Sequence, residues 1–401
     1  MTSGTAAFTA RAPTHAAAAR PPSPFARAGD HAVARAAEAR GGRFSEFMLT
    51  GGATLVLFPL SWLLKTTFGL SASEYAFGFA TFYGAYVIND PHFSVTYLLF
   101  YKDARRRTLA ASYDLSYRIR YAIAGFLVPA ALVGWAFAAL ASHAAEQLGS
   151  MIQLMFFLVG WHYVKQGFGV LAVLSARRGV RMTSRERAVI LVHCFAAWAY
   201  AWASPAAPAG EFAEKGVVYH ALAHPRWLAI TTGWVLAVST VALAGVLFGR
   251  WRREKTMLPW APLAGFIITV WSWTIYSSAD RLIQYLIPAL HSIQYFYFVW
   301  LMKRNEARAE EGPPSFGRPT AVRLGVLAVS ALVLGWLLFR GAPTLLDGLR
   351  TPRTLRHGPI DALGVTPFFA AFFVVVNIHH YFMDHVIWRR DNPDTRYLRA
   401  T

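Results

Sequence analysis

Long apolar runs recur along the chain and are separated by shorter stretches rich in Lys and Arg. Each run is about 20 residues, the length at which an α-helix crosses a hydrocarbon core of roughly 30 Å. The pattern therefore predicts an all-α, polytopic transmembrane helical bundle of about ten spans. The expected spans are 47–68, 74–101, 117–142, 149–177, 187–204, 226–249, 257–277, 281–302, 322–340 and 362–388.

The two ends of the chain lack this pattern. Residues 1–45 consist largely of Ala, Arg and Pro, a composition that predicts a disordered basic tail. We expect a transmembrane helical domain over 46–390 and a cytoplasmic C-terminal tail over 391–401.

The connections between spans alternate in charge. The basic ones are 102–116, 177–187, 250–255 and 303–318, and the poorly charged ones are 69–73, 143–148 and 205–225. By the positive-inside rule this alternation predicts that both termini are cytoplasmic, in a multi-pass protein of a bacterial inner membrane. Loop 341–361 disagrees, because it should face outward and yet contains Arg350, Arg353 and Arg356.

Composition excludes several classes of protein. Of the 401 residues 55% are hydrophobic and 15% charged, against about 25% charged in a typical soluble domain. The net charge of +18 lies in loops, which indicates topology signals and contacts with anionic membrane lipid rather than nucleic acid. A single cysteine, Cys194, excludes a disulfide framework and a cysteine-ligated zinc or iron–sulfur site.

Polar residues gather at membrane depth in four of the expected spans, where they are costly and mark candidate functional sites. Histidine is common to all four groups. The groups are Asn89-Asp90-Pro91-His92, His162 with Lys165 and Gln166, His291 with Gln284 and Gln294, and Asn377 with His379, His380, Asp384 and His385.

Helical spacing places several of these side chains on shared faces. Asn377, His380 and Asp384 form one stripe, whereas His379 points about 100° away from His380. All four groups lie at similar depth on spans that run in the same direction, so they can meet in one cavity. The candidate metal ligands are His92, His162, His291, His379 and His380, and the candidate catalytic or orienting residues are Asp384, Asn377, Gln166 and Gln294.

Each residue also has a simpler interpretation. A single membrane histidine commonly hydrogen-bonds between helices without binding a metal. Asp384 can pair with Arg389 at the interface, and Lys165 can extend toward the headgroups.

These residue types favour metal chemistry. Imidazole with a few carboxylates suits iron, zinc, copper or manganese, and such sites with open positions suit non-haem Fe²⁺ and O₂. A buried ferrous site would act on an apolar lipid or isoprenoid that arrives from the bilayer. Aromatic residues near the four groups, including Trp161, Tyr163, Tyr295 and Tyr381, would pack such a substrate. The sequence does not identify an electron donor.

The residues His92, His162, His291 and His379-His380 loosely resemble two groups of membrane iron oxygenases. One is the Brp/Blh-type carotene dioxygenases, for which the resemblance implies one iron held by histidines of several helices. The other, more distant, is the membrane fatty-acid desaturase and hydroxylase superfamily, which has three histidine boxes around two irons. The chain has no H-x-x-H-H, and its one H-x-x-x-H, at His220 and His224, falls in an expected outer loop.

Two other functions use the same residue types. A b-type haem electron-transfer protein would bracket its haem with His162 and His291, or with His92 and His380. A proton-coupled transporter would use buried His, Asp and Lys, although no inverted repeat is visible.

Overall fold

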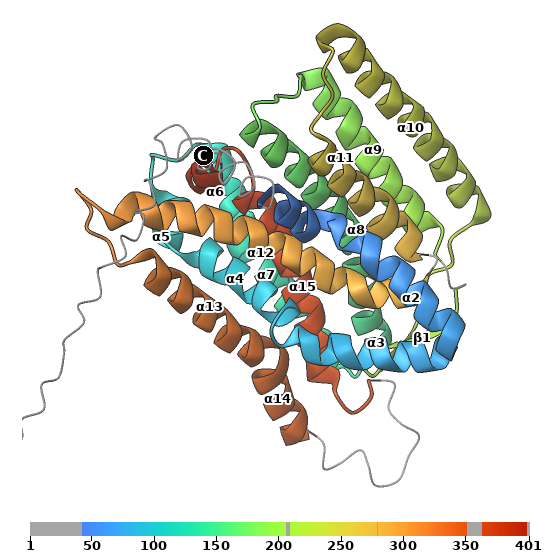
Figure 1. Cartoon of the computed structure of the whole chain (residues 1–401). Coiled ribbons are helices and arrows are strands. Elements are labelled where there is room, and N and C mark those ends of the chain that lie inside the picture. The colour runs from blue at the N-terminus through green and yellow to red at the C-terminus, as the bar shows by residue number, and fades with distance from the viewer. Residues whose placement is uncertain (1–41, 206–208, 279, 351–362, 399–401) are drawn as a thin grey trace, which may run out of the picture. The chain divides into compact units, whose positions relative to one another are not determined.

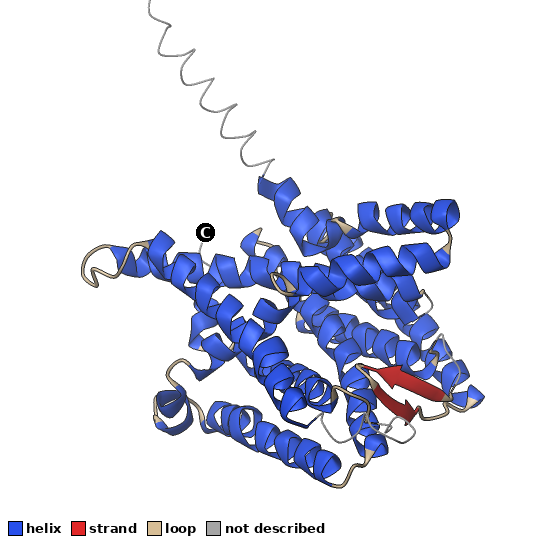
Figure 2. Cartoon of the chain, turned by 90° about the horizontal axis from the view of Figure 1, so that it is seen from below, coloured by secondary structure: helices blue, strands red, loops and turns tan. Residues whose placement is uncertain are grey.

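The computed structural model describes residues 42–205, 209–278, 280–350 and 363–398. The described residues from Glu46 onward form one compact unit. The predicted disorder of the N-terminal tail falls almost wholly outside the described residues. Within the described part the chain is helical apart from one hairpin, which Figure 2 shows in red.

The α-helices are α2 (Thr54–Phe68), α3 (Leu70–Ala85), α4 (Asn89–Tyr101), α5 (Ala104–Leu109), α6 (Leu115–Ala122), α7 (Val128–Ala141), α8 (Ala145–Arg177), α9 (Ser184–Ala203), α10 (Arg226–Glu254), α11 (Trp260–Ile267), α12 (Arg281–Glu311), α13 (Thr320–Trp336), α14 (Ala342–Arg350) and α15 (Pro367–Ile387). Short π and 3₁₀ helices are η1 (Met48–Gly52), η2 (Ile123–Leu127), η3 (Ile268–Ile275), η4 (Tyr276–Ser278), η5 (Leu337–Gly341) and η6 (Pro393–Leu398). Strands β1 (Glu211–Glu214) and β2 (Val217–His220) are antiparallel, with Glu211 opposite His220.

Five described helices are long and apolar enough to cross a membrane, which makes the chain a multi-pass membrane protein. They are Leu115–Ala141, Ala145–Arg177, Arg226–Glu254, Thr320–Leu349 and Pro367–Ile387. A pair bent by 51°, Gly42–Gly52 with Thr54–Phe68, adds a sixth if it forms one broken span.

The expected count of ten spans is therefore not reproduced, although every predicted span is helical. The predicted span 74–101 is interrupted at 86–88, and its pieces α3 and α4 have only 16 and 13 residues. Helix α12 has 31 residues, but Gln284, His291 and Gln294 lower its mean hydropathy. The doubtful loop 341–361 falls partly outside the described residues, because the structure describes it only as far as 350.

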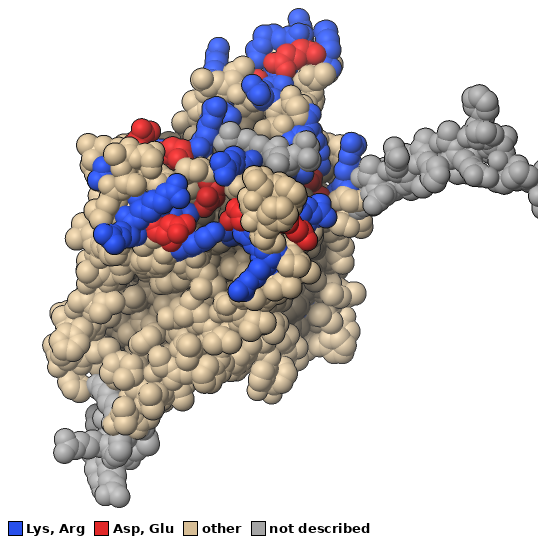
Figure 3. All heavy atoms as spheres, turned by 90° about the vertical axis from the view of Figure 1, so that its left-hand side faces the viewer, with Lys and Arg blue, Asp and Glu red and all other residues tan. Residues whose placement is uncertain are grey.

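Charged residues gather at one end of the compact unit, as Figure 3 shows. Three contacts between loops hold this end together. They are Lys102 Nζ to Glu306 Oε1 at 3.1 Å, Arg107 to Asp394 at 2.6 Å, and Arg250 to Glu186 at 3.0 Å. Loops 102–116 and 303–318 form one group with the C-terminal segment, and loops 177–187 and 250–255 form another. A hydrogen bond from Arg177 to the carbonyl of Leu398 connects the two groups. The four basic loops and the described C-terminal segment thus lie at the same end.

The poorly charged loops meet elsewhere. Nδ1 of His220 on the hairpin lies 2.7 Å from Oε1 of Glu146, which connects the loops 143–148 and 205–225. Thr366, just before α15, donates a hydrogen bond to the carbonyl of Lys215 at 3.3 Å. The contacts thus bring two of the three poorly charged loops, 143–148 and 205–225, together, in agreement with the positive-inside pattern.

Helices α4 and α8 both pack against α15, and α12, which crosses the front of the bundle in Figure 1, packs against α4. Helix α15 is the most enclosed of the candidate spans, because 72% of its apolar 18-residue stretch is buried. Helix α9 packs against α8, α10 packs against α9, and α13 packs against α4. The α13–α4 contact is close because Gly335 lacks a side chain: a Cβ there would lie 2.8 Å from the backbone carbon of Asp90.

Candidate metal centre

Each interior helix contributes one imidazole to a common point. His92 lies in the first turn of α4, just after the interruption at 86–88. Pro91 is tolerated there because the backbone N–H groups in the first turn of a helix have no carbonyl partner within the helix, so the N–H that proline lacks costs no hydrogen bond. Further along the chain, α8 presents His162 near its middle, α12 presents His291 and α15 presents His380.

The four imidazoles lie close enough together to approach the coordination shell of one ion. One ring nitrogen from each of His92, His162, His291 and His380 can be chosen so that all four atoms lie within 4.8 Å of one another. The Nε2 atoms of His162 and His291 are 3.0 Å apart. Nitrogens bound about 2.0–2.1 Å from one metal ion are about 3 Å apart when they are adjacent ligands. The spacing therefore fits a mononuclear metal site.

Several polar atoms at this point have no hydrogen-bond partner among the described residues. They are both ring nitrogens of His92, both ring nitrogens of His380, Nδ1 of His291 and Oδ2 of Asp384. All of these residues are buried. Buried polar groups are normally satisfied, and each exception needs an explanation, which a bound ion would provide.

No protein-family model, no curated protein and no solved structure significantly matches the chain. The function therefore has to be argued from this geometry.

Asp384 lies beside the imidazoles, one turn after His380. Its Oδ2 is 3.5 Å from Nε2 of His380 and 3.8 Å from Nε2 of His162. Its Oδ1 accepts a hydrogen bond from the hydroxyl of Tyr295 at 2.9 Å. The hydroxyls of Tyr295 and Thr96 are 2.7 Å apart. The interpretation of Asp384 as an interfacial partner of Arg389 does not fit, because Asp384 is buried and Arg389 pairs with Asp391.

His379 lies outside the group of four imidazoles. Its Nδ1 is 2.9 Å from the hydroxyl of Tyr97, and its Nε2 is 3.0 Å from the carbonyl of Ala124. Both nitrogens thus have partners on neighbouring helices, as expected for a packing histidine. The ligand set that the geometry supports consists of the other four predicted histidines.

The side chains of the three candidate amide residues hydrogen-bond to backbone carbonyls, to one another or to a tyrosine, and not to the imidazole nitrogens of the described structure. Gln166 donates to Oε1 of Gln294 at 2.8 Å and to the carbonyl of His291 at 3.3 Å. Gln294 donates in turn to the carbonyl of Thr50 at 2.7 Å. The helix there is broken at Gly51 (φ 143°), so the carbonyl needs such a partner in an apolar interior.

Asn377 donates to the carbonyl of Phe373 at 2.7 Å and accepts from the hydroxyl of Tyr381 at 3.2 Å. The ring of Tyr381 packs against His162 with centroids 4.8 Å apart. Asn377 therefore acts through Tyr381, by fixing an aromatic ring that covers one of the imidazoles.

Two relationships at the centre were not predicted from the sequence. Tyr295 and Thr96 each follow a cluster histidine by four residues, a spacing that would have placed them on the same faces as His291 and His92. Asp90, two residues before His92, lies 3.5 Å from Nε of Arg340. That pair joins residues 250 positions apart, and no local pattern indicates it.

Proposed function

We propose that the protein is a membrane-embedded, metal-dependent oxidoreductase that uses O₂ to oxidise a lipid or isoprenoid substrate. The observation that carries the proposal is the group of four buried imidazoles from four helices, with polar atoms that have no partner among the described residues. We propose non-haem Fe²⁺ as the metal, because imidazole sites with open positions suit iron and dioxygen. Bound ferrous iron would supply the redox chemistry with O₂.

The protein residues around the centre manage its charge. A divalent ion brings two positive charges into an apolar interior, and four neutral imidazoles offset neither of them. The Asp384 carboxylate supplies one negative charge beside His380 and His162. Tyr295 holds that carboxylate through its other oxygen. Asp384 and Tyr295 thus orient the imidazoles and offset part of the charge of the ion without binding it themselves.

Aromatic rings enclose the imidazoles. The ring centroids of Tyr295 and His92 are 4.5 Å apart, those of Tyr163 and His291 are 4.6 Å apart, and those of Phe93 and His380 are 4.8 Å apart. This enclosure would keep bulk water from the reacting atoms and favour an apolar substrate from the bilayer. The activity is of the kind that the resemblance to carotene dioxygenases implies. The choice among cleavage, hydroxylation and desaturation is left to experiment.

The alternative of a b-type haem is less compatible with the spacing of the rings. The centroids of His162 and His291 are 4.8 Å apart, and those of His92 and His380 are 4.5 Å apart. Imidazoles in mutual ring contact leave no room for a porphyrin plane between them. A single ion fits the same space.

The test is metal analysis of the purified full-length protein with its spectrum. We expect one iron per chain, no haem absorption band, and O₂ consumption when carotenoids or unsaturated acyl lipids are supplied in nanodiscs. Substituting His92, His162, His291 or His380 singly by Ala should remove the iron while the protein stays monodisperse in detergent. His385→Ala is the matched control, because His385 is on α15 but outside the cluster.

Three outcomes would contradict the proposal. A haem spectrum would indicate electron transfer. Full iron content in the alanine variants would show that the four histidines pack between helices and do not bind the iron. A metal-free wild type that moves protons with a solute in proteoliposomes would indicate a transporter.

We also propose that the basic end of the compact unit faces the cytoplasm of a bacterial cell, with both termini inside. The shared position of the four basic loops supports this orientation.

A further inference from the structure

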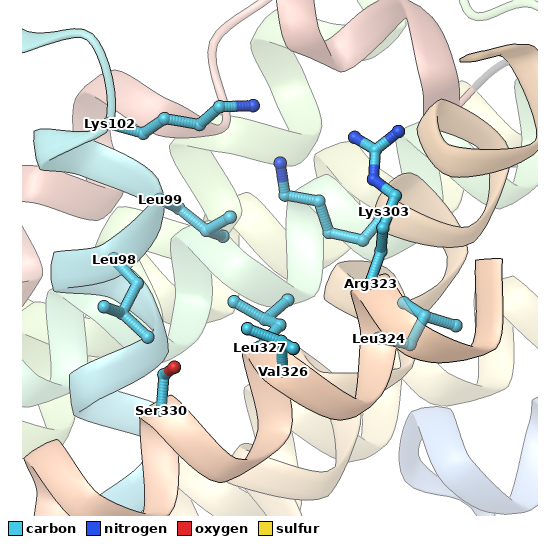
Figure 4. A pocket seen from close by; sticks show the side chains of 9 residues that line it. All are labelled: Leu98, Leu99, Lys102, Lys303, Arg323, Leu324, Val326, Leu327 and Ser330. Atoms are coloured by element: carbon cyan, nitrogen blue, oxygen red, sulfur yellow. The ribbon is translucent and has the colours of Figure 1, made fainter. Parts of the chain in front are cut away.

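A crevice of about 230 Å³ lies between α4, α12 and α13. Figure 4 shows its two parts. Three cationic side chains, Lys102, Lys303 and Arg323, stand at one end, and apolar side chains that include Leu98, Leu99 and Leu327 line the rest.

The crevice begins where the close contact between α4 and α13 stops. At the contact, Ser94 donates to the carbonyl of Ala331 at 2.8 Å, and Gly335 touches the backbone of Asp90. The lining residues Ser330 to Arg323 occupy the next two turns of α13, toward the charged end of the unit. Outside the crevice lining, α13 exposes Val322 and Val329, as a helix in contact with lipid would.

The three cations at this end of the crevice have fewer than three carboxylates within ion-pair distance among the described residues. Lys102 and Lys303 both pair with the buried carboxylate of Glu306, at 3.1 and 2.5 Å. Arg323 lies 3.7 Å from the same carboxylate and 2.6 Å from that of Glu310, which is 41% exposed. Three cations thus share two carboxylates, while Asp103 and Asp394 act on Lys102 only from further away.

We propose that this crevice binds an anionic membrane phospholipid, with the phosphate at Lys102, Lys303 and Arg323 and one acyl chain along Leu98, Leu99 and Leu327. Basic pockets between helices near the cytoplasmic surface have the chemistry that anionic headgroups require. The volume is below the roughly 300–1,000 Å³ of sites that enclose a whole ligand. It therefore suits a headgroup and the first part of one chain, with the remainder in the bilayer. The proposal does not depend on the metal centre.

The experiment compares phosphatidylglycerol with phosphatidylcholine of the same acyl chains on the delipidated full-length protein. Thermal stability and native mass spectrometry are the measurements. We expect one retained phosphatidylglycerol per chain and a higher Tm with phosphatidylglycerol than with phosphatidylcholine. Lys303→Gln combined with Arg323→Gln should weaken phosphatidylglycerol binding about thirtyfold, at about fivefold for each cation near the membrane surface.

Removing two cations leaves Glu306 with fewer partners, so the double variant can lose its fold for a reason unrelated to lipid binding. A second variant therefore tests the same crevice without changing any charge. Ser330→Phe adds volume to the crevice and keeps every charge. It should remove the preference for phosphatidylglycerol and leave the iron content unchanged. Arg105→Gln with Arg106→Gln is the matched control, because it removes two exposed charges outside the crevice lining and should change nothing.

Equal stabilisation of the wild type by both lipids would overturn the proposal. So would an unchanged lipid preference in Ser330→Phe. Stabilisation by millimolar inorganic phosphate alone, equal to that by phosphatidylglycerol, would show a simple anion site and would also overturn it.

Discussion

The hydroxyl of Tyr295 donates to Oδ1 of Asp384 at 2.9 Å, while Oδ2 of the same carboxylate stands 3.5 Å from Nε2 of His380. Tyr295 comes from α12 and Asp384 from α15. One hydrogen bond between two interior helices therefore sets the direction in which the carboxylate faces the imidazoles.

Removing only this hydroxyl should weaken metal binding. Tyr295→Phe keeps the ring against His92 but releases Oδ1 of Asp384, so we expect iron affinity to fall about 10–100-fold in a folded protein. Titration with a competing chelator would measure the fall, and Asp384→Asn should act similarly.

Tyr297→Phe is the control, because the Tyr297 hydroxyl donates to Glu46 at 2.9 Å. If Tyr295→Phe bound iron as tightly as Tyr297→Phe, the carboxylate would not need its tyrosine partner.

Gln294 should matter for stability and not for the metal. Gln294→Leu leaves the buried carbonyl of Thr50 without its side-chain donor, which should cost about 1–3 kcal/mol. Thermal unfolding should show a lower Tm, with the iron content per folded molecule preserved. Gln284→Leu, at an exposed site on the same helix, should have a smaller effect. Loss of iron in Gln294→Leu would instead place this amide at the centre.

Thiol labelling can establish which end of the unit faces the cytoplasm. The one cysteine, Cys194, is buried, so an introduced cysteine at an exposed site would be the main target. In intact cells an impermeant reagent should label Ser142→Cys and should not label Arg105→Cys. Reporter fusions at residues 110, 182 and 401 should all report the inside. An outside result at residue 182 would break the orientation that we propose.

The hairpin should loosen as the pH rises. The hydrogen bond to Glu146 raises the pKa of His220, so protonated His220 contributes to the folded state. That contribution is complete below the ordinary histidine pKa of about 6.5 and is lost as the pH rises through the raised value. Because both side chains are exposed, the effect should be small and should weaken with salt.

Hydrogen exchange of residues 211–220 should therefore accelerate from pH 6 to pH 8 by more than the intrinsic rate does. Glu146→Gln should remove the excess. The same excess in that variant would mean that another group is responsible.

The position of the centre could be predicted because each ligand had a local signal. His162, His291 and His380 lie in apolar runs where polar groups are costly. His379 was also expected as a ligand, although helical spacing pointed it about 100° away from His380, and in the structure it lies outside the group. Spacing did not reveal the roles of Gln166 and Gln294. Their partners include a carbonyl freed by the break at Gly51, and a tertiary break of this kind leaves no periodic trace.

The structure shows five or six candidate spans and not the expected ten, for a related reason. An apolar run gives the amount of helix but not its continuity, and the interruption at 86–88 splits one expected span into two short helices. Arg340 illustrates the same limit. From the sequence it is one more basic residue at the end of a span, whereas in the structure it lies against Asp90 and the rings of Phe82 and Tyr86.

The order of the four ligands along the chain has a consequence for biosynthesis. His92, His162 and His291 are translated well before His380, which lies on the last long helix. Membrane insertion proceeds from the N-terminus, so a growing chain holds three of the imidazoles and lacks the fourth until α15 has been made. Completion of the proposed centre, and any stability gained from an ion there, therefore waits for α15. A nascent chain that stalls before α15 would leave an incomplete site, which a cell could distinguish from the finished protein by its failure to retain metal.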